Sequence, residues 1–320
     1  MSGSTNTKRP AKAAEQAGLA LGLTLAAAFL AAILLTMPKY AATGIHPFQI
    51  TFFRYVTGLT VLLVFYGVKA MWGVDRSGER NRFSQPYENW TWLHIIRAAM
   101  ATARVTSAFA AVSLIPLANA QAVMLTNGVF MMLFAAIFLG EKVPAAAIWL
   151  GAACLGGGFL AADPDLGDPT SWYSLGAGLS FFSAVMYGLE SVIIKFTAER
   201  DHNRRILFVV NCSALVFTSI PAYFLWTPVT PENLWFLLPL GPIAVMIQVC
   251  NMEALRRARS SIIVPMRYTV VVFGVLIGIM VFGEYPSVQA IIGMTIITIS
   301  GVFLAWLTNN SRRKSESGSG

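Results

Sequence analysis

Charged residues are scarce in this sequence. Only 12% of its 320 residues are Asp, Glu, Lys or Arg, which is about half the share found in a soluble domain. The three cysteines all lie within apolar runs, and the three histidines form no H-E-x-x-H pair. A G-x-S-x-G elbow is also missing. These absences exclude a soluble globular fold, and they lead us to expect no enzyme activity, no metal site and no cofactor.

Long apolar runs fill nearly the whole chain instead, in keeping with its 56% hydrophobic residues. A helix needs about 20 apolar residues to cross a bilayer. The runs are continuous and rich in Leu, Ala, Ile and Phe, which predicts helices rather than the alternating strands of a barrel. The expected fold is an all-α integral membrane protein with ten transmembrane helices and polar tails at 1–17 and 308–320. The predicted spans are 18–37, 47–70, 93–114, 117–139, 144–162, 173–195, 205–226, 234–255, 260–282 and 286–307.

The basic residues behind the net charge of +8 sit in short segments between the apolar runs. They do not gather into one patch, so we expect no nucleic-acid partner. Lys and Arg mark both termini and every second connection, whereas Lys39 is the basic residue of the opposite connections. By the positive-inside rule, both termini and the 73–89 loop are predicted to be cytoplasmic and the 163–168 loop external, in a multi-pass protein of the cytoplasmic (inner) membrane.

An internal repeat divides the chain into two halves. Phe138-Leu139-Gly140-Glu141 and Val281-Phe282-Gly283-Glu284 lie 143 residues apart, and the same offset pairs Thr126 with Thr269. Earlier in the chain, an offset of 156 pairs Lys39 with Lys195. Each half contains five spans, and an odd number of spans inverts the second half relative to the first. The predicted domains are therefore two inverted five-helix repeats at 18–162 and 174–307.

Five short motifs are spread over the two halves: Phe53-Arg54-Tyr55, Pro116-Leu117-Ala118-Asn119-Ala120, Leu139-Gly140-Glu141-Lys142, Pro265-Met266-Arg267-Tyr268-Thr269 and Phe282-Gly283-Glu284-Tyr285-Pro286. In their order and spacing they resemble the motifs of the drug/metabolite transporter superfamily, EamA type. The resemblance implies ten helices around a central cavity that is lined mainly by spans one to four and six to nine. It also implies transport, but members carry amino acids, vitamins, nucleotide conjugates, organic acids and drugs, so it does not name a substrate.

Four arginines lie inside spans, where a charge costs about 3 kcal/mol or more on insertion scales. Arg54, Arg104 and Arg267 are placed near the bilayer centre, whereas Arg97 is shallower and is interpreted as mainly interfacial, although it shares a helix face with Arg104. A guanidinium facing a cavity would bind a carboxylate. It could equally lock helices together. We favour the structural role for Arg54 and leave both roles open for Arg104 and Arg267.

Two acids also lie within spans. Glu190 and Glu253 could carry a proton and couple transport to a gradient, or they could neutralise an arginine, and the excess of arginines favours pairing. Glu141 and Glu284 follow the fourth span of each half and are predicted to cap the N-termini of spans five and ten.

The sequence therefore predicts a secondary transporter, or permease, that moves a carboxylate-bearing, anionic or zwitterionic metabolite across the bilayer by alternating access. Alternatives are an exporter of aromatic amino acids, vitamins or drugs and, from another class, a channel or a membrane scaffold. Small residues at 145–147 and 156–158 would allow close helix contact, within the fold or in a homodimer. The predicted substrate-binding residues are Arg267, Arg104, Asn127, Tyr268, Gln248, Asn251 and Arg54.

Overall fold

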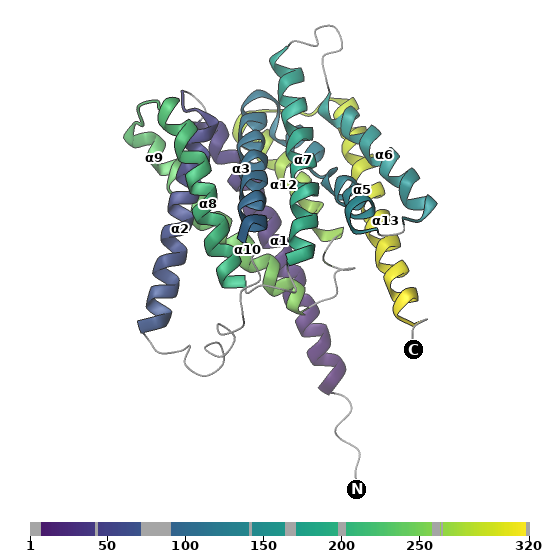
Figure 1. The fold of residues 1–320 in the computed structure, drawn as a ribbon. Helices are drawn as coiled ribbons and strands as arrows, with labels where there is room; N and C mark the ends of the chain where they lie inside the picture. The colour runs from purple at the N-terminus through teal and green to yellow at the C-terminus, as the bar shows by residue number, and fades with distance from the viewer. Residues whose placement is uncertain are drawn as a thin grey trace.

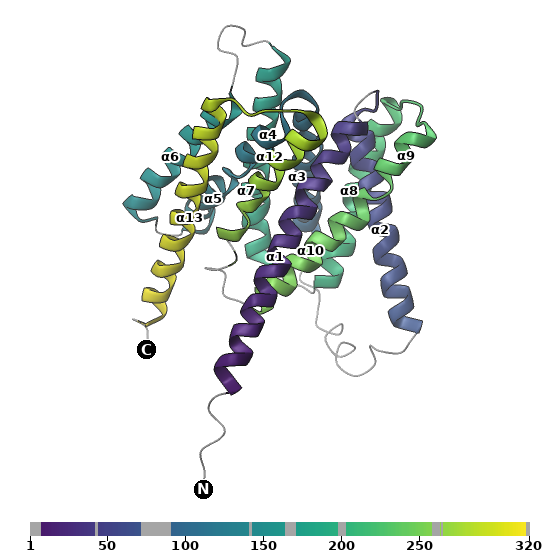
Figure 2. The ribbon, with the colours of Figure 1, turned by 180° about the vertical axis from the view of Figure 1, so that it is seen from behind.

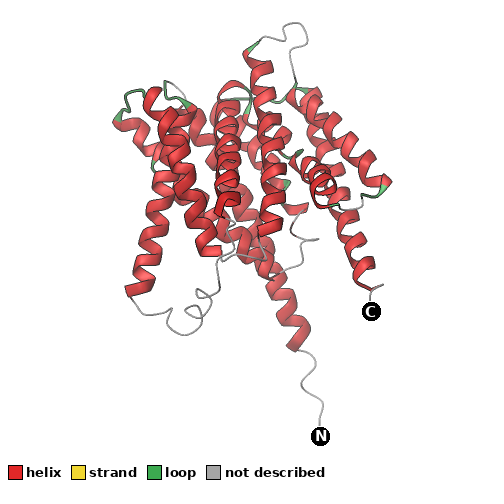
Figure 3. Ribbon diagram, in the orientation of Figure 1, coloured by secondary structure: helices red, strands yellow, loops and turns green. Residues whose placement is uncertain are grey.

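The computed structural model describes residues 8–41, 44–71, 91–140, 143–163, 171–197, 203–257, 263 and 265–317. Within these ranges the regular elements are helices, and no strand occurs (Figure 3). The 73–89 loop and Glu141 lie outside them. The helices are α1 (Lys8–Ala41), α2 (Pro47–Met71), α3 (Thr91–Leu114), α4 (Leu117–Met124), α5 (Asn127–Leu139), α6 (Ala145–Ala162), α7 (Trp172–Thr197), α8 (Asn203–Phe224), α9 (Pro231–Leu237), α10 (Leu240–Arg257), α12 (Thr269–Ile277), the π-helical η2 (Gly278–Phe282) and α13 (Val288–Ser317).

The apolar helices match the ten predicted spans one for one. Seven described segments are long and apolar enough to cross a membrane, and three shorter apolar helices, Phe208–Phe224, Thr269–Phe282 and Val288–Leu304, complete the set. Both chain termini lie at the same end of the bundle (Figures 1 and 2), as an even number of spans requires. The predicted all-α, ten-helix membrane fold is therefore confirmed.

Spans four and nine are both broken near their middle. Span four consists of α4 and α5, and span nine resumes as α12 after a turn at Arg267 and Tyr268. The Thr126 hydroxyl donates to the Val123 carbonyl at 2.7 Å, and the Thr269 hydroxyl donates to the Met266 carbonyl at 2.6 Å. A threonine hydroxyl that bonds a carbonyl one turn back competes with the helical ladder and bends the helix.

The two breaks are equivalent in the repeat, and other features follow the same symmetry. Gly140 and Gly283, which end spans four and nine, both adopt the left-handed conformation, with φ 66° and ψ 24° or 22°. Helix packing follows the same plan, because α3 packs on α7 as α1 packs on α10, and α6 packs on α13. Such pairing is the arrangement of two inverted five-helix repeats.

A core of small and apolar residues holds α4, α5, α6, α12 and α13 together. Glycines permit the closest approaches. A Cβ added to Gly293 of α13 would lie 2.3 Å from the Ala161 nitrogen of α6. The surface carries large apolar side chains, among them Trp149 and Trp235, which are 77% and 81% exposed. Such a surface suits contact with lipid rather than with water.

Candidate functional site

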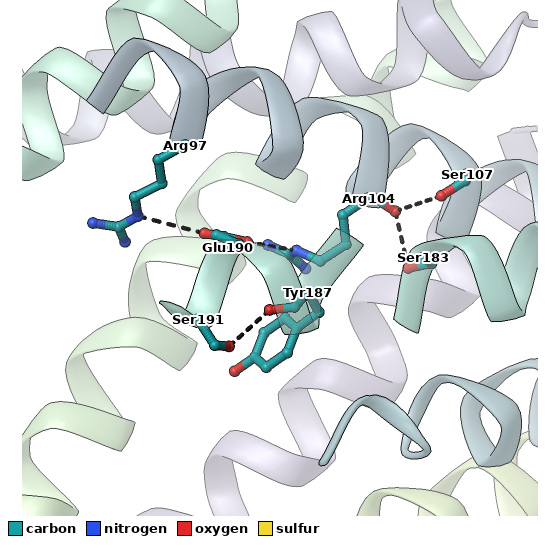
Figure 4. Close-up of polar contacts among 7 residues, drawn as sticks. All are labelled: Arg97, Arg104, Ser107, Ser183, Tyr187, Glu190 and Ser191. Atoms are coloured by element: carbon teal, nitrogen blue, oxygen red, sulfur yellow. Dashed lines mark hydrogen bonds and ion pairs between the residues drawn. The ribbon is translucent and has the colours of Figure 1, made fainter. Parts of the chain in front are cut away.

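Helices α3 and α7 bring one acid and two arginines together (Figure 4). The Arg104 Nε donates to Glu190 Oε2 at 2.9 Å, and the Arg97 Nε lies 3.6 Å from Glu190 Oε1. The second distance makes an ion pair but is too long for a hydrogen bond. Only 7% of the Glu190 side chain is exposed, against 13% for Arg97 and 26% for Arg104. We call Arg97, Arg104 and Glu190 the charged cluster, and its formal charge is +1.

The sequence spacing explains this geometry. Arg97 and Arg104 are seven residues apart, which places them two turns apart on the same face of α3. Glu190 lies between their side chains, as Figure 4 shows. Ser183 of α7 donates to the Arg104 carbonyl at 3.1 Å, and Ser107 donates to the same carbonyl at 3.0 Å. The Ser183 bond joins α3 to α7 beside the cluster and fixes the height at which the three charged groups meet.

An aromatic ring completes the surroundings of Arg104. The Arg104 Cζ lies 5.2 Å from the centroid of the Tyr187 ring, and Tyr187 precedes Glu190 by one helical turn. A guanidinium over a ring face is attracted by the ring quadrupole. A guanidinium carries five N–H donors, and within the described ranges only the Nε donor of Arg104 is hydrogen-bonded. Arg104 is therefore fixed by a carboxylate and a ring, while its Nη donors stay available to a ligand.

Arg54 of α2 makes no ion pair with the described residues. Its Cζ lies 4.8 Å from the centroid of the Tyr55 ring, and its buried Nε has no hydrogen-bond partner in the described part of the chain. Tyr55 is 4% exposed and packs with Ala98 of α3. Arg54 thus lies beside α3, but no described contact joins it to the charged cluster.

The predicted site residues of spans four and nine lie at the two helix breaks. Arg267 is exposed within the turn before α12, and Asn127 is the first residue of α5. Tyr268 points into the core instead, because a Cβ on Gly301 would lie 1.9 Å from its hydroxyl oxygen and one on Gly128 would lie 3.9 Å from it. The breaks therefore lie next to each other, but none of the described contacts connects them to the charged cluster.

The predicted residues Gln248 and Asn251 both lie on α10, three residues apart. Gln248 is exposed, and the Asn251 side chain donates to the Ile247 carbonyl of its own helix at 3.0 Å. Glu253 forms an ion pair with Arg257 at 3.1 Å, four residues further along the helix. Both membrane acids thus contact arginines in the structure. Groups of three or more His, Cys, Asp or Glu side chains that could hold a metal ion are absent from the described residues.

Glu284 does not cap span ten, and that interpretation is wrong. The Ser287 hydroxyl accepts the Ala290 N–H of α13 at 3.0 Å, so span ten has a cap from its own chain segment. Glu284 turns away from α13 because Gly283 before it is left-handed. Its Oε2 accepts the Leu117 N–H at the start of α4 at 3.0 Å, and its Oε1 binds Lys39. The corresponding expectation for Glu141 falls outside the described residues.

From the sequence, Arg97 of the charged cluster is interpreted as mainly interfacial, although it shares a helix face with Arg104 at seven-residue spacing. Tyr187 is one of several aromatic residues that could stack on a ring-bearing substrate, but it is not among the predicted substrate-binding residues. Its position one helical turn from the membrane residue Glu190 is the signal that could have selected it.

Several curated proteins are similar to the chain along most of its length. The Pseudopaline exporter CntI of Pseudomonas aeruginosa (strain UCBPP-PA14) is 26% identical over 88% of this chain and 94% of its own. The S-adenosylmethionine uptake transporter of Rickettsia bellii is 24% identical over 87% and 90%, and the Riboflavin transporter of Vibrio cholerae is 24% identical over 91% and 94%. All three names describe transporters of small molecules.

A solved structure, titled only as the crystal structure of a protein, shares the fold. Its TM-score is 0.59 at 19% identity, and the match covers 90% of this chain and 96% of the other. The sequence pattern of the EamA-like transporter family matches residues 18–162 and 174–307. These two matches span most of the ten-helix bundle, and they show that the chain belongs to the EamA-like transporter family.

Proposed function

We propose that the chain is a secondary transporter for a small metabolite that carries a carboxylate, and that it works by alternating access. The observation that carries this proposal is the charged cluster, in which two guanidiniums share the single carboxylate of Glu190. The excess positive charge lies within a membrane span, where charges are weakly screened. A substrate carboxylate would neutralise it.

The free donors of the cluster suit such a group. The Arg104 Nη atoms could donate to both oxygens of a substrate carboxylate, since the guanidinium fork matches carboxylate geometry. Arg97 would supply a second cation from the same helix face. Glu190 would hold the two arginines in position, and it could also accept an ammonium group from a zwitterionic substrate. The flat face of Tyr187 would pack against the rest of the molecule.

The remaining predicted residues take supporting places in this proposal. Arg267 is exposed at the break of span nine, so we propose that it contacts the substrate together with Gln248 of the same repeat and Asn127 of the first repeat. Asn251, Tyr268 and Arg54 would shape the helices that surround the site. Because two guanidiniums lie within ion-pair distance of Glu190, we propose charge pairing rather than proton coupling for it.

The names of the relatives support small-molecule transport but not a direction. One is named an exporter and another an uptake transporter. The proposed location is the cytoplasmic membrane, with both termini in the cytoplasm, as the distribution of Lys and Arg predicts. A homodimer stays a prediction from the small residues of span five.

Flux into liposomes that contain the purified protein tests the proposal. A carrier shows saturable uptake and counterflow, a channel shows ohmic current, and a scaffold shows neither. With a panel of carboxylates, amino acids and organic cations, we expect counterflow for carboxylate-bearing compounds. Arg104→Gln should then weaken apparent affinity by about tenfold or more, as the loss of one charge-assisted contact implies.

Arg257→Gln is the matched control, because Arg257 pairs with Glu253 of its own helix and none of the described contacts joins it to the charged cluster. It should leave apparent affinity unchanged. A preference for cations, or an Arg104→Gln variant that folds and transports with the affinity of the parent protein, would refute the carboxylate site.

A further inference from the structure

A second ion pair of low exposure lies at the end of the bundle opposite the termini. Lys39, near the end of α1, donates to the carboxylate of Glu284 and also to the Ile115 carbonyl, the latter at 3.2 Å. The side chains of Lys39 and Glu284 are 15% and 22% exposed. The Lys39 Nζ also lies 5.1 Å from the centroid of the Phe282 ring. This pair is therefore largely shielded from its surroundings.

The Glu284 carboxylate also binds the start of helix α4. Glu284 Oε2 accepts the N–H of Leu117, the first residue of α4, at 3.0 Å. Pro116 occupies the N-cap position and supplies no side-chain hydrogen bond, so Glu284 replaces the missing cap. The Glu284 N–H donates to the Gly278 carbonyl at 2.9 Å and holds the acid against the end of η2. One side chain of the second repeat thus binds two helices of the first.

Neighbouring contacts also join the repeats at this end. Tyr40 stacks on Phe236 of α9 with ring centroids 5.2 Å apart, and its centroid lies 5.1 Å from that of Phe282. Asn119 of α4 donates to the Tyr173 hydroxyl of α7 at 3.0 Å. Figure 2 shows that α1 crosses the bundle to reach this end, away from the N-terminus. The contacts of Lys39 and Glu284 are the charged part of this junction.

We propose that Lys39 and Glu284 form a latch that holds this end of the transport pathway shut. In transporters with inverted repeats, one group of helices rocks against the other, so contacts between repeats at one end must part when that end opens. Charge-assisted bonds are about twice as strong as neutral ones, and partial burial limits their screening by salt. The latch would therefore set how often the pathway opens to that side. This inference rests on the alternating access proposed above, but not on the substrate class.

Cysteine labelling tests the latch without any substrate. Val112→Cys, on a background in which the three native cysteines are replaced, puts a thiol in the fully buried apolar cluster that also contains Ile115 and Leu117. A membrane-impermeant maleimide is added from the side opposite the termini. Lys39→Met and Glu284→Gln should each raise the labelling rate by about tenfold, as loss of one charge-assisted bond implies. The double variant should raise the rate by less than the product of the two single effects, because both single variants remove the same Lys39–Glu284 bond.

Glu232→Gln is the control, since Glu232 is an exposed acid of α9 at the same end, and it should not change the rate. Unchanged labelling in Lys39→Met and Glu284→Gln, or an equal rise in Glu232→Gln, would overturn the latch. Should a neutral variant fail to fold, Glu284→Asp keeps the charge but shortens the side chain. Faster labelling in Glu284→Asp would support the latch, and a parental rate would overturn it.

Discussion

Among the single residues of the charged cluster, we expect Glu190 to matter most for stability, because its carboxylate neutralises two arginines at once. Glu190→Gln would leave two partly buried guanidiniums without a carboxylate, whereas Arg97→Gln would leave a neutral pair of Arg104 and Glu190. Breaking a buried pair by removal of one partner costs about 3–5 kcal/mol. We expect Glu190→Gln to lower the melting temperature of the purified protein much more than Arg97→Gln does. Equal melting temperatures for these two variants would argue against a shared carboxylate.

The space opposite Tyr268 allows a matched pair of glycine substitutions. A Cβ on Gly301 would lie 1.9 Å from the Tyr268 hydroxyl oxygen and 2.2 Å from Cζ, whereas a Cβ on Gly156 would meet nothing within 4 Å. Overpacking a filled site costs about 1–3 kcal/mol. Gly301→Ala should therefore lower thermal stability, and Gly156→Ala should leave it unchanged or raise it slightly. Comparable stability of the two variants would show that Tyr268 moves aside freely.

Single residues of the candidate site could be predicted only in part. A charge inside a membrane span is costly, and this argument was enough to identify Arg104 and Glu190 as candidate residues from the sequence. The partner of each charge could not be selected in this way, because partners depend on which helices pack together. The sequence gives the order of spans, whereas the contact of α3 with α7 comes from the tertiary structure. For the same reason, Tyr268 was expected at the substrate but lies in the core.

The breaks of spans four and nine are the main feature at the scale of elements. Thr126 is fully buried, and its hydroxyl donates to the Val123 carbonyl, so Thr126→Val would leave that carbonyl without the bond. We expect a loss of about 1 kcal/mol in stability, seen as a lower melting temperature. Thr295→Val is the control, because the Thr295 hydroxyl bonds the Ile291 carbonyl on an exposed helix face. A larger effect at Thr295 would contradict a special role for the break.

Apolar run length was enough to place all ten spans, because a bilayer fixes the length of any helix that crosses it. It could not show that spans four, eight and nine are each divided. Span eight changes direction between α9 and α10 at Pro239, which has no N–H to donate. Spans four and nine break at threonines, which are frequent within unbroken membrane helices as well. The match of Thr126 with Thr269 in the repeat, together with Pro265 just before the break of span nine, could have indicated these breaks.

The two-fold plan of the whole molecule does not extend to its charges. At the positions equivalent to Arg104 and Glu190, the other repeat carries Ile247 and Leu34. The α1–α10 contact therefore repeats the packing of α3 on α7 without a counterpart of the Arg104–Glu190 pair. If the protein works by alternating access as proposed above, symmetric packing would supply its two similar conformations, and an asymmetric cluster would hold the substrate in a single orientation on one side of the axis.

The orientation of the whole molecule gives the last prediction. Both termini share one end of the bundle with the Arg257 end of α10, and Glu232 of α9 lies at the opposite end (Figures 1 and 2). Because Lys and Arg concentrate near the termini, that end should face the cytoplasm. With the native cysteines replaced, Glu232→Cys in intact cells should react with a membrane-impermeant maleimide, and Arg257→Cys should react only after permeabilisation. The opposite labelling pattern would reverse the orientation, place the Lys39–Glu284 latch on the cytoplasmic side, and leave the ten-helix fold unchanged.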